Sequence, residues 1–373
     1  MIRNKAIVVG SGIVGISTAL ALLKKNYSVT LLEKNERAVG ASIRNFGMIW
    51  PIGQSHGELF QLALRSKALW EDWSEQAGFH LDRNGSIHLA YHPDEFEVLS
   101  EFYENEKKVR NIRLVNPVEA VNLSPAINRG NLAGGLFSAD EGLVHPGEAN
   151  KKLSSWLQSL PNCQIEYNSP VFSIEGNACF CPQKKYEADL IFVASGADIE
   201  FLFPDILRES GVKCQLQMMR TPPQPHGFKM GPSLCGGLTL LHYPAFGSLP
   251  SLQALKNRMS TEQADLLKLG IHVMAAQNQA GEVTIGDSHL YGNEFDPFIS
   301  QDINEKILTY LKTFCSLPDQ QIQHYWKGVY LKSKGSLPYF IHRVNPECTL
   351  INGLGGAGMT LSPGLAEQLI NSL

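Results

Sequence analysis

The sequence has little net charge, no long apolar run and few cysteines, and each shortage excludes a class of protein. The formal net charge is only −4 and no long basic run occurs, so we expect no nucleic-acid partner. No stretch approaches the ~20 apolar residues that a membrane-spanning helix requires. The chain also begins directly on an expected strand, which leaves no room for a signal peptide. We therefore expect a cytoplasmic protein without a transmembrane segment.

Cysteine usage excludes a disulfide scaffold. The chain has seven cysteines, an odd number that does not suit a disulfide framework. The closest pair, Cys179 and Cys181, has the wrong spacing for a CxxC metal or redox site. We expect all seven to be reduced packing residues, and we expect no metal site.

What the sequence does contain is the composition of an ordinary globular protein with a nucleotide-binding start. Its 373 residues suit two domains, and 43% hydrophobic with 18% charged residues is typical of a soluble fold. The apolar run Lys5–Val9 predicts a buried parallel strand, followed by a helix over 13–25 and a second strand over 28–32. Three glycines with the spacing G-x-G-x-x-G follow the first strand and lead into the helix.

This spacing predicts a dinucleotide-binding turn. Gly10 permits the tight turn, Gly12 lets the backbone approach a pyrophosphate, and Gly15 lets the helix pack closely on the strand. The helix N-terminus offers N–H groups to the phosphates, and Glu33 ends the second strand where an acid accepts hydrogen bonds from a ribose. The residues expected at this end of the cofactor are Gly10, Ser11, Gly12, Ile13, Val14, Gly15, Glu33 and Lys34.

A second glycine-rich turn, Asn352–Thr360, lies near the other end of the chain. A lone fingerprint suits NAD as well as FAD, whereas a closing glycine turn before a short last helix favours a flavin pocket. We expect that last helix to begin at Ser362 as N-cap, with Pro363 at its first position. The N–H groups of Gly358–Thr360 would then stabilise negative charge on a reduced flavin.

The middle of the chain predicts an interleaved second domain. Amphipathic periodicity predicts a helix over 58–78 whose Trp70 and Trp73 pack in the protein core. Further helices are expected over 94–110, 146–160, 251–268 and 302–314. Strands are expected over 86–91, 164–167, 171–174, 189–193, 213–220, 238–243, 272–276, 282–285, 322–332 and 349–352. The fold class is therefore α/β, with a mixed or antiparallel substrate sheet. The discontinuous cofactor domain would comprise 1–50, 140–210 and 325–373, and the substrate domain 51–139 and 211–324.

Together these motifs resemble the D-amino-acid oxidase superfamily of FAD-dependent oxidoreductases, which includes glycine oxidase, sarcosine oxidase and D-amino-acid dehydrogenases. The resemblance covers nearly the whole chain and implies a Rossmann-like domain of the glutathione-reductase type. It rests on the fingerprint, the loop Gly40–Gly47, Val171, the segment Val193–Ala197 and the turn Gly353–Thr360. By this resemblance, further FAD-binding residues are Ala41, Ser42, Arg44, Asn45, Phe46, Gly47, Val171, Ala194, Ser195, Gly196, Gly355, Gly356, Gly358, Met359 and Thr360.

Two departures from the family pattern affect the expected chemistry. Tyr330 stands where relatives carry the arginine that binds a substrate carboxylate. No cysteine lies between Cys315 and Cys348, where monomeric sarcosine oxidase attaches its flavin, so FAD is expected to be noncovalent. The candidate catalytic or substrate-binding residues are Arg44, Arg220, His242, Tyr330 and Lys332. Arg220 and Lys332 suit an anion clamp or a solvated charge equally, and His242 suits a pocket or a core position. His145 is expected to cap a helix.

The resemblance implies an enzyme that oxidises the C–N bond of a small amine or amino acid. Hydride passes to flavin N5, and the resulting imine is hydrolysed. The segments 44–51, 217–221 and 286–292 further resemble a subgroup associated with aminophosphonate breakdown. The alternatives are an FAD-dependent 2-hydroxy-acid dehydrogenase with a histidine base, a flavin-binding subunit of a larger complex, and an NAD-dependent dehydrogenase. The sequence leaves the oligomeric state open.

Overall fold

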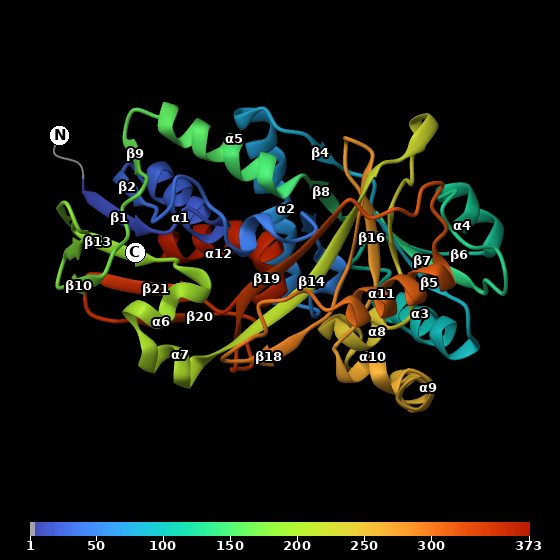
Figure 1. Ribbon diagram of the computed structural model, residues 1–373. Coiled ribbons are helices and arrows are strands. Elements are labelled where there is room, and N and C mark those ends of the chain that lie inside the picture. The colour runs from blue at the N-terminus through green and yellow to red at the C-terminus, as the bar shows by residue number, and fades with distance from the viewer. Residues whose placement is uncertain (1–3) are drawn as a thin grey trace.

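Two large sheets, built from segments that alternate along the chain, organise the computed structural model, which describes residues 4–373 (Figure 1). The first has six strands in the order β20-β21-β13-β1-β2-β9. All neighbours in it are parallel except the antiparallel pair β20 and β21. The bounds are β1 (Lys5–Val9), β2 (Ser28–Leu32), β9 (Cys163–Glu166), β13 (Leu190–Val193), β20 (Phe340–Arg343) and β21 (Cys348–Asn352). The parallel strands expected at 5–9, 28–32, 189–193 and 349–352 are confirmed.

Helices cover one face of this sheet and a small antiparallel sheet covers the other. The apolar core of the helical face joins α1 (Ile13–Lys24), α2 (Glu58–Ala77), α5 (Pro146–Ser159) and α12 (Gly358–Asn371). Trp70 and Trp73 on α2 are buried in it, as expected. The opposite face packs on β10 (Ser173–Glu175), β11 (Ala178–Phe180), β12 (Lys185–Glu187), α6 (Ile199–Leu202) and α7 (Pro204–Ser210).

The second sheet has nine strands and is mixed, because β15 runs parallel to β5 while its other pairs are antiparallel. Its order is β18-β14-β17-β16-β15-β5-β7-β6, and β19 also pairs with β14. The bounds are β5 (Ser86–Ala90), β6 (Ile112–Val115), β7 (Gly134–Ser138), β14 (Gly211–Pro223), β15 (Ser233–Cys235), β16 (Met274–Gln277), β17 (Glu282–Gly286), β18 (Leu290–Gly292) and β19 (His324–Ser333). The helices α3 (Pro93–Glu106), α4 (Pro117–Leu123), α8 (Thr239–His242), α9 (Leu252–Glu262), α10 (Ala264–Lys268) and α11 (Gln301–Phe314) contribute to its core.

The long antiparallel pair β14 and β19 connects the two halves of the molecule (Figure 1). Their register runs from Gly211 opposite Ser333 to Arg220 opposite His324. At its far end, Lys332 forms a bridge with Leu354, beside the closing glycine turn. A short sheet of β3 (Met48–Ile49), β4 (Leu81–Asp82) and β8 (Gly142–Val144) contributes side chains to the apolar cores of both halves. The proposed domain boundaries at 210 and 325 therefore fall at the two ends of this strand pair.

Two expectations about the middle of the chain are wrong. The run 238–243 is not a strand, since it contains the short helix α8. The helix begins after two glycines, and Leu238 N–H donates to the Tyr310 hydroxyl at 3.0 Å, a tertiary contact that local pattern does not reveal. The expected helix over 251–268 is divided into α9 and α10, because Gln263 has a non-helical backbone.

The last helix also begins earlier than expected. α12 starts at Gly358, so Ser362 is not its N-cap and Pro363 lies inside it. Proline has no N–H to bond the carbonyl four residues earlier, and here the Trp70 indole donates to the Met359 carbonyl at 2.7 Å instead. The next N–H, that of Gly364, donates to Ser66 Oγ at 2.9 Å. Side chains of α2 therefore replace the helix's own hydrogen bonds around the proline.

Within residues 4–373, no helix is both long and apolar enough to cross a membrane. All seven cysteines are free, and six of them are buried.

Candidate active site

A cavity of about 1100 Å³ extends from the first glycine turn to the strands of the nine-stranded sheet. This volume exceeds the roughly 300–1,000 Å³ of sites for drug-sized ligands. Segments that are far apart in the sequence line it: the fingerprint, the 38–50 loop, β19, the closing glycine turn and the edge of the large sheet. The size and shape therefore suit a dinucleotide with a small substrate beside it.

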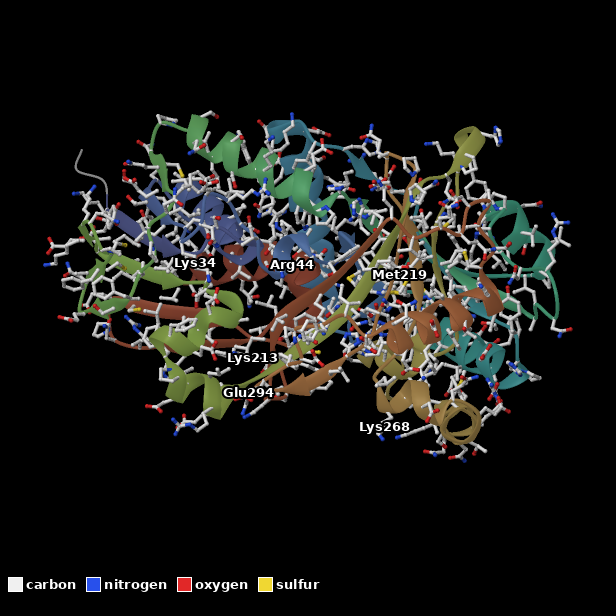
Figure 2. All side chains as sticks on the ribbon, in the orientation of Figure 1. Lys34, Arg44, Lys213, Met219, Lys268 and Glu294 are labelled. Carbon is white, nitrogen blue, oxygen red and sulfur yellow. The ribbon has the colours of Figure 1, made fainter. Side chains whose placement is uncertain are left out.

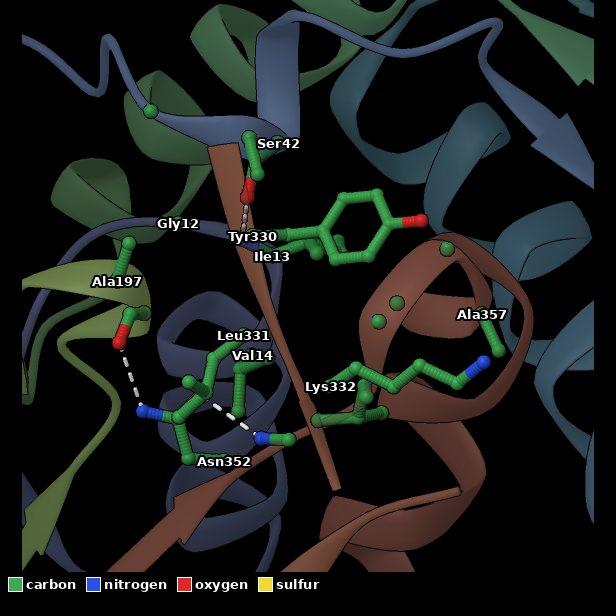
Figure 3. A pocket seen from close by; sticks show the side chains of 18 of the residues that line it. Gly12, Ile13, Val14, Ser42, Ala197, Tyr330, Leu331, Lys332, Asn352 and Ala357 are labelled. Atoms are coloured by element: carbon green, nitrogen blue, oxygen red, sulfur yellow. Dashed lines mark hydrogen bonds between the residues drawn. The ribbon is translucent and has the colours of Figure 1, made fainter. Parts of the chain in front are cut away.

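The fingerprint glycines occupy positions where a side chain would collide with backbone. Gly10 has φ +103°, and a Cβ there would lie 2.6 Å from the Ala194 carbonyl oxygen. A Cβ on Gly15 would lie 1.8 Å from the Gly10 carbonyl oxygen. Gly12, the N-cap of α1, has no capping side chain and lines the cavity, so the helix N-terminus is open to an anionic group. Ser42 Oγ accepts the Ile13 N–H at 2.9 Å and ties the 40–47 loop to this turn (Figure 3).

Glu33 is buried at the end of β2 and also lines the cavity. Its carboxylate accepts the Ser11 N–H at 2.9 Å and the Ser11 hydroxyl at 2.7 Å. It also accepts the Asn35 N–H at 3.0 Å. Ser11 and Gly15 do not line the cavity, so their part is to hold the turn. Lys34 lines it and forms an ion pair with Asp198 at 2.8 Å.

The 40–47 loop is held by its own polar side chain. Asn45 Nδ2 donates to the Ala41 carbonyl at 2.9 Å, and Asn45 Oδ1 accepts the Gly47 N–H at 2.6 Å. Gly47 has φ +83° and packs against Val144, outside the cavity lining. Arg44, labelled near the centre of Figure 2, lines the cavity and donates to the Lys327 carbonyl at 3.3 Å. The loop therefore presents Ala41, Ser42, Arg44, Asn45 and Phe46 to the cavity.

The remaining expected cofactor residues meet at the closing turn. Val171, Ala194, Ser195, Gly196, Gly355, Gly356, Gly358, Met359 and Thr360 all line the cavity. Asn352 Nδ2 donates to the Gly196 carbonyl at 2.8 Å, which joins the turn after β13 to the end of β21. The buried Ser195 hydroxyl has no protein partner. Because α12 begins at Gly358, its positive N-terminal end lies at the cavity wall itself. These residues fit an elongated FAD molecule.

A wall of polar side chains closes the other end of the cavity. It comprises His242, Tyr243, His272, Asp287, His289, Tyr291, Tyr330 and Lys332. Figure 3 shows Tyr330 and Lys332 projecting from the same side of β19. The rings of His242 and His272 stack at a centroid distance of 3.7 Å and an angle of 7°. Ring nitrogens of His242, His272 and His289 lie within 4.8 Å of one another.

Two backbone segments orient the buried members of this wall. His289 Nδ1 lies 3.1 Å from the Gly270 carbonyl oxygen, and His272 Nδ1 lies 3.4 Å from Asp287 Oδ1. The backbones of His272 and Asp287 exchange two hydrogen bonds, which continue the β16–β17 hairpin. The sequence interpretation missed His272, Asp287 and His289. The expected strands over 272–276 and 282–285 could have revealed them, since an antiparallel hairpin brings its two outer ends together.

Burial keeps this wall largely uncharged. It lowers the pKa of His242 and His272 well below the ordinary histidine value, and lowers the pKa of His289 to about 4. Burial also raises the pKa of the Asp287 carboxyl well above its usual range. All three histidines line the cavity: His272 and His289 are buried, and His242 is surrounded by protein atoms although its side chain stays accessible from the cavity. At neutral pH the wall thus holds neutral imidazoles beside the Lys332 ammonium group.

The structure does not bring Arg220 to the cavity. Its side chain is half-buried on β14, where Nε donates to Thr284 Oγ1 at 3.2 Å and Nη1 lies 3.5 Å from a Glu282 carboxylate oxygen. Nη1 also lies 3.3 Å from Nε2 of His145. The expected helix cap is confirmed, because His145 Nδ1 accepts the Glu148 N–H at 3.1 Å. The expected candidates Arg44, His242, Tyr330 and Lys332 do line the cavity.

Comparison with known proteins gives a match over nearly the whole chain. The family model described as "FAD dependent oxidoreductase" (DAO) matches residues 5–371. The chain is 28% identical over 184 residues to L-2-hydroxyglutarate dehydrogenase of Dictyostelium discoideum, covering 46% of this chain and 41% of that protein. It is 24% identical over 250 residues to D-amino acid dehydrogenase of Helicobacter pylori, covering 52% of this chain and 60% of that protein. The matches thus span about half the length of these curated relatives.

The fold is also that of a solved structure. Glycine oxidase from Geobacillus kaustophilus superposes with a TM-score of 0.77, covering 100% of this chain and 95% of that one. Its sequence identity is 21%, so this likeness concerns the fold.

Proposed function

The chain belongs to the DAO family of FAD-dependent oxidoreductases, and from this premise we propose that it oxidises the C–N bond of a small amine or amino acid. The observation that carries the proposal is the position of the histidine wall. Neutral imidazoles line the same cavity as the closing glycine turn and β19. A substrate held there would lie between a proton acceptor and the flavin-binding loops.

The cofactor supplies the redox chemistry when bound, because its flavin ring accepts a hydride. The protein's own groups would prepare the substrate. An amine can release hydride from the adjacent carbon only after its ammonium form has lost a proton, and a neutral histidine of the wall can accept that proton. The N-terminus of α12, beginning at Gly358, would stabilise the negative charge that develops on the flavin side of the cavity.

Noncovalent attachment of FAD belongs to this proposal. No cysteine is among the described residues that line the cavity, so no thiol is placed to bond the flavin ring. The names of similar proteins support an amine substrate, since they include a D-amino acid dehydrogenase and a glycine oxidase.

The substrate can be narrowed to an aminophosphonate as a finer form of the proposal. Tyr330 is buried at the end of the cavity, at the position where the family pattern has a carboxylate-binding arginine. A phosphonate has three oxygens, and the several N–H and O–H groups of the polar wall can bind them from different directions.

An FAD-dependent 2-hydroxy-acid dehydrogenase is the second candidate. Oxidation of an alcohol requires a base for the hydroxyl proton, and the pair of His272 and Asp287, 3.4 Å apart, has the composition of such a base. One similar protein is an L-2-hydroxyglutarate dehydrogenase.

Anaerobic bleaching of the flavin tests these proposals. The purified protein should be yellow, and its absorbance should decrease on mixing with amines, D-amino acids, aminophosphonates or hydroxy acids offered singly. Bleaching by an aminophosphonate alone supports the finer proposal, and bleaching by ordinary amino acids alone refutes it. Bleaching by hydroxy acids without any amine establishes the second candidate. Readmission of air then separates an oxidase from a dehydrogenase.

A further inference from the structure

We propose that His242, His272 and His289 form, together with Lys332, a binding site for a doubly charged tetrahedral oxyanion, and that the histidines take up a proton when it binds. In the enzyme this oxyanion would be the head group of the substrate, so the inference rests on the proposed function and specifies its substrate class.

The first observation is convergence from four parts of the fold. His242 ends α8, His272 precedes β16, His289 follows β17, and Lys332 lies on β19. Their side chains nevertheless line one end of a single cavity, with the three imidazoles in mutual contact. A packing role would not require four separate segments to bring basic side chains to one end of a cavity.

The second observation is the orientation of His289. A carbonyl oxygen only accepts hydrogen bonds, so the bond between His289 Nδ1 and the Gly270 carbonyl, at 3.1 Å, requires the proton on Nδ1. In the neutral ring Nε2 is then an acceptor without a proton. An oxyanion also only accepts, so His289 can bind one through Nε2 only after that nitrogen has been protonated. Proton uptake thus follows from the geometry of the hydrogen bond.

The third observation is the charge of the surrounding groups. Lys332 provides one positive charge, and its Nζ lies 3.3 Å from the Tyr291 hydroxyl. The other titratable groups in contact with the histidines or with Lys332 are Tyr243, Tyr291, Tyr330 and Asp287. Burial raises the pKa of each of them and so favours their uncharged forms. A dianion beside one lysine leaves one negative charge unbalanced, which a single added proton cancels, whereas a monoanion needs none.

The same three nitrogens could in principle hold a divalent metal ion, and the ring geometry argues against it. Lone pairs of metal ligands must point to one centre. The His242 and His272 rings stack 3.7 Å apart and within 7° of parallel, so their in-plane lone pairs lie in two separate planes and do not meet at one ion. Donors in two separate planes instead suit two separate oxygens of a tetrahedral anion.

Sulfate is the probe that tests this site in the FAD-loaded protein, because it keeps both charges through the neutral pH range and cannot be oxidised. Isothermal titration in two buffers of different ionisation enthalpy counts the protons taken up. We expect one sulfate per chain, uptake of about one proton, and an affinity that falls about tenfold per pH unit. Acetate, a monoanion, should bind more weakly and without proton uptake.

Three variants sharpen the test. His289→Gln offers an N–H donor that needs no proton, so its sulfate affinity should depend on pH less than half as steeply as that of the unchanged protein. Lys332→Met should weaken sulfate binding by about tenfold or more, the value of a hydrogen bond to a charged group. His145→Asn is the matched control: it lies outside the cavity, and asparagine can still cap α5. It should leave both measurements unchanged.

Several results would overturn the site: no sulfate binding, binding without proton uptake, an unchanged pH slope in His289→Gln, or stoichiometric Zn²⁺ binding that excludes sulfate. The wild-type proton count decides the matter even if a variant fails to fold. Sulfate binding without flavin bleaching by any amine would refute the proposed function and leave the site intact. Flavin bleaching by an amine without sulfate binding would refute the anion site and leave the proposed function intact.

Discussion

Replacing Trp70 by phenylalanine should weaken both the last helix and the cavity wall that it carries. Pro363 offers no N–H to the Met359 carbonyl, and the Trp70 indole supplies the missing donor at 2.7 Å. Trp70 is only 1% exposed and Met359 is also buried, so this hydrogen bond lies away from bulk solvent. Met359 and Thr360 line the cavity immediately beside this bond, and loosening them should reach the cofactor.

The magnitude follows from the buried carbonyl. An unsatisfied buried acceptor costs about 1–3 kcal/mol, and the smaller phenylalanine ring adds the cost of lost packing. We therefore expect Trp70→Phe to lower the free energy of unfolding by roughly 2–4 kcal/mol. Urea unfolding measures this change, and titration of the FAD-free protein with FAD measures the accompanying loss of cofactor affinity.

A double-mutant cycle separates the hydrogen bond from the packing. Pro363→Ala restores a backbone N–H that can bond the Met359 carbonyl, so Trp70→Phe should cost at least about 1 kcal/mol less in that background. The lost ring volume is the same in both backgrounds and cancels. If the two substitutions are additive within about 0.5 kcal/mol, the indole does not serve the carbonyl that the proline leaves free.

Three further predictions concern the cofactor end and a buried acid. Gly15→Ala should give colourless protein, because its Cβ would lie 1.8 Å from a carbonyl oxygen. The control Gly130→Ala, which has open space around its Cβ, should stay yellow. A yellow Gly15→Ala protein would contradict the close packing of this turn. Glu33→Gln should weaken FAD binding roughly 10- to 100-fold, as expected for charge-assisted hydrogen bonds; an unchanged dissociation constant would remove Glu33 from the site. Burial raises the pKa of Glu141 to about 7, so the folded protein retains a proton that the unfolded chain releases above its ordinary value of about 4.3. The contribution of Glu141 to stability should therefore fall, by on the order of 3 kcal/mol, as pH rises from that value to 7. In urea unfolding at several pH values, the difference in stability between Glu141→Gln and the unchanged protein should change by about this amount over the same range.

Much of the cofactor half could be predicted from the sequence because its signals are local. The tight turn at Gly10, the helix after it and the acid at Glu33 depend on neighbouring residues and on a fixed spacing. The structure confirms the strands and the helix, and it shows backbone atoms in the space where side chains at Gly10 and Gly15 would lie. The requirement for glycine at positions 10 and 15 could therefore be predicted before any tertiary contact was known.

The start of the last helix, by contrast, could not be predicted from local sequence. Ser362 and Pro363 have the pattern of a helix N-terminus, and local propensity places it there. The helix begins at Gly358 because Trp70, 289 residues before Met359, donates to the carbonyl that the proline leaves free. No local pattern contains a contact across that distance.

By itself the sequence determined the family pattern, the glycine turns and the alternation of cofactor and substrate segments, because these depend on residue type and short spacing. Tertiary structure alone decided which charged and titratable side chains face the cavity. Arg220 lies on β14 and His272 lies just before β16 of the same sheet, yet Arg220 pairs with Glu282 and His272 lines the cavity. Strand register and sheet face make that choice, and a shift of one residue would reverse it.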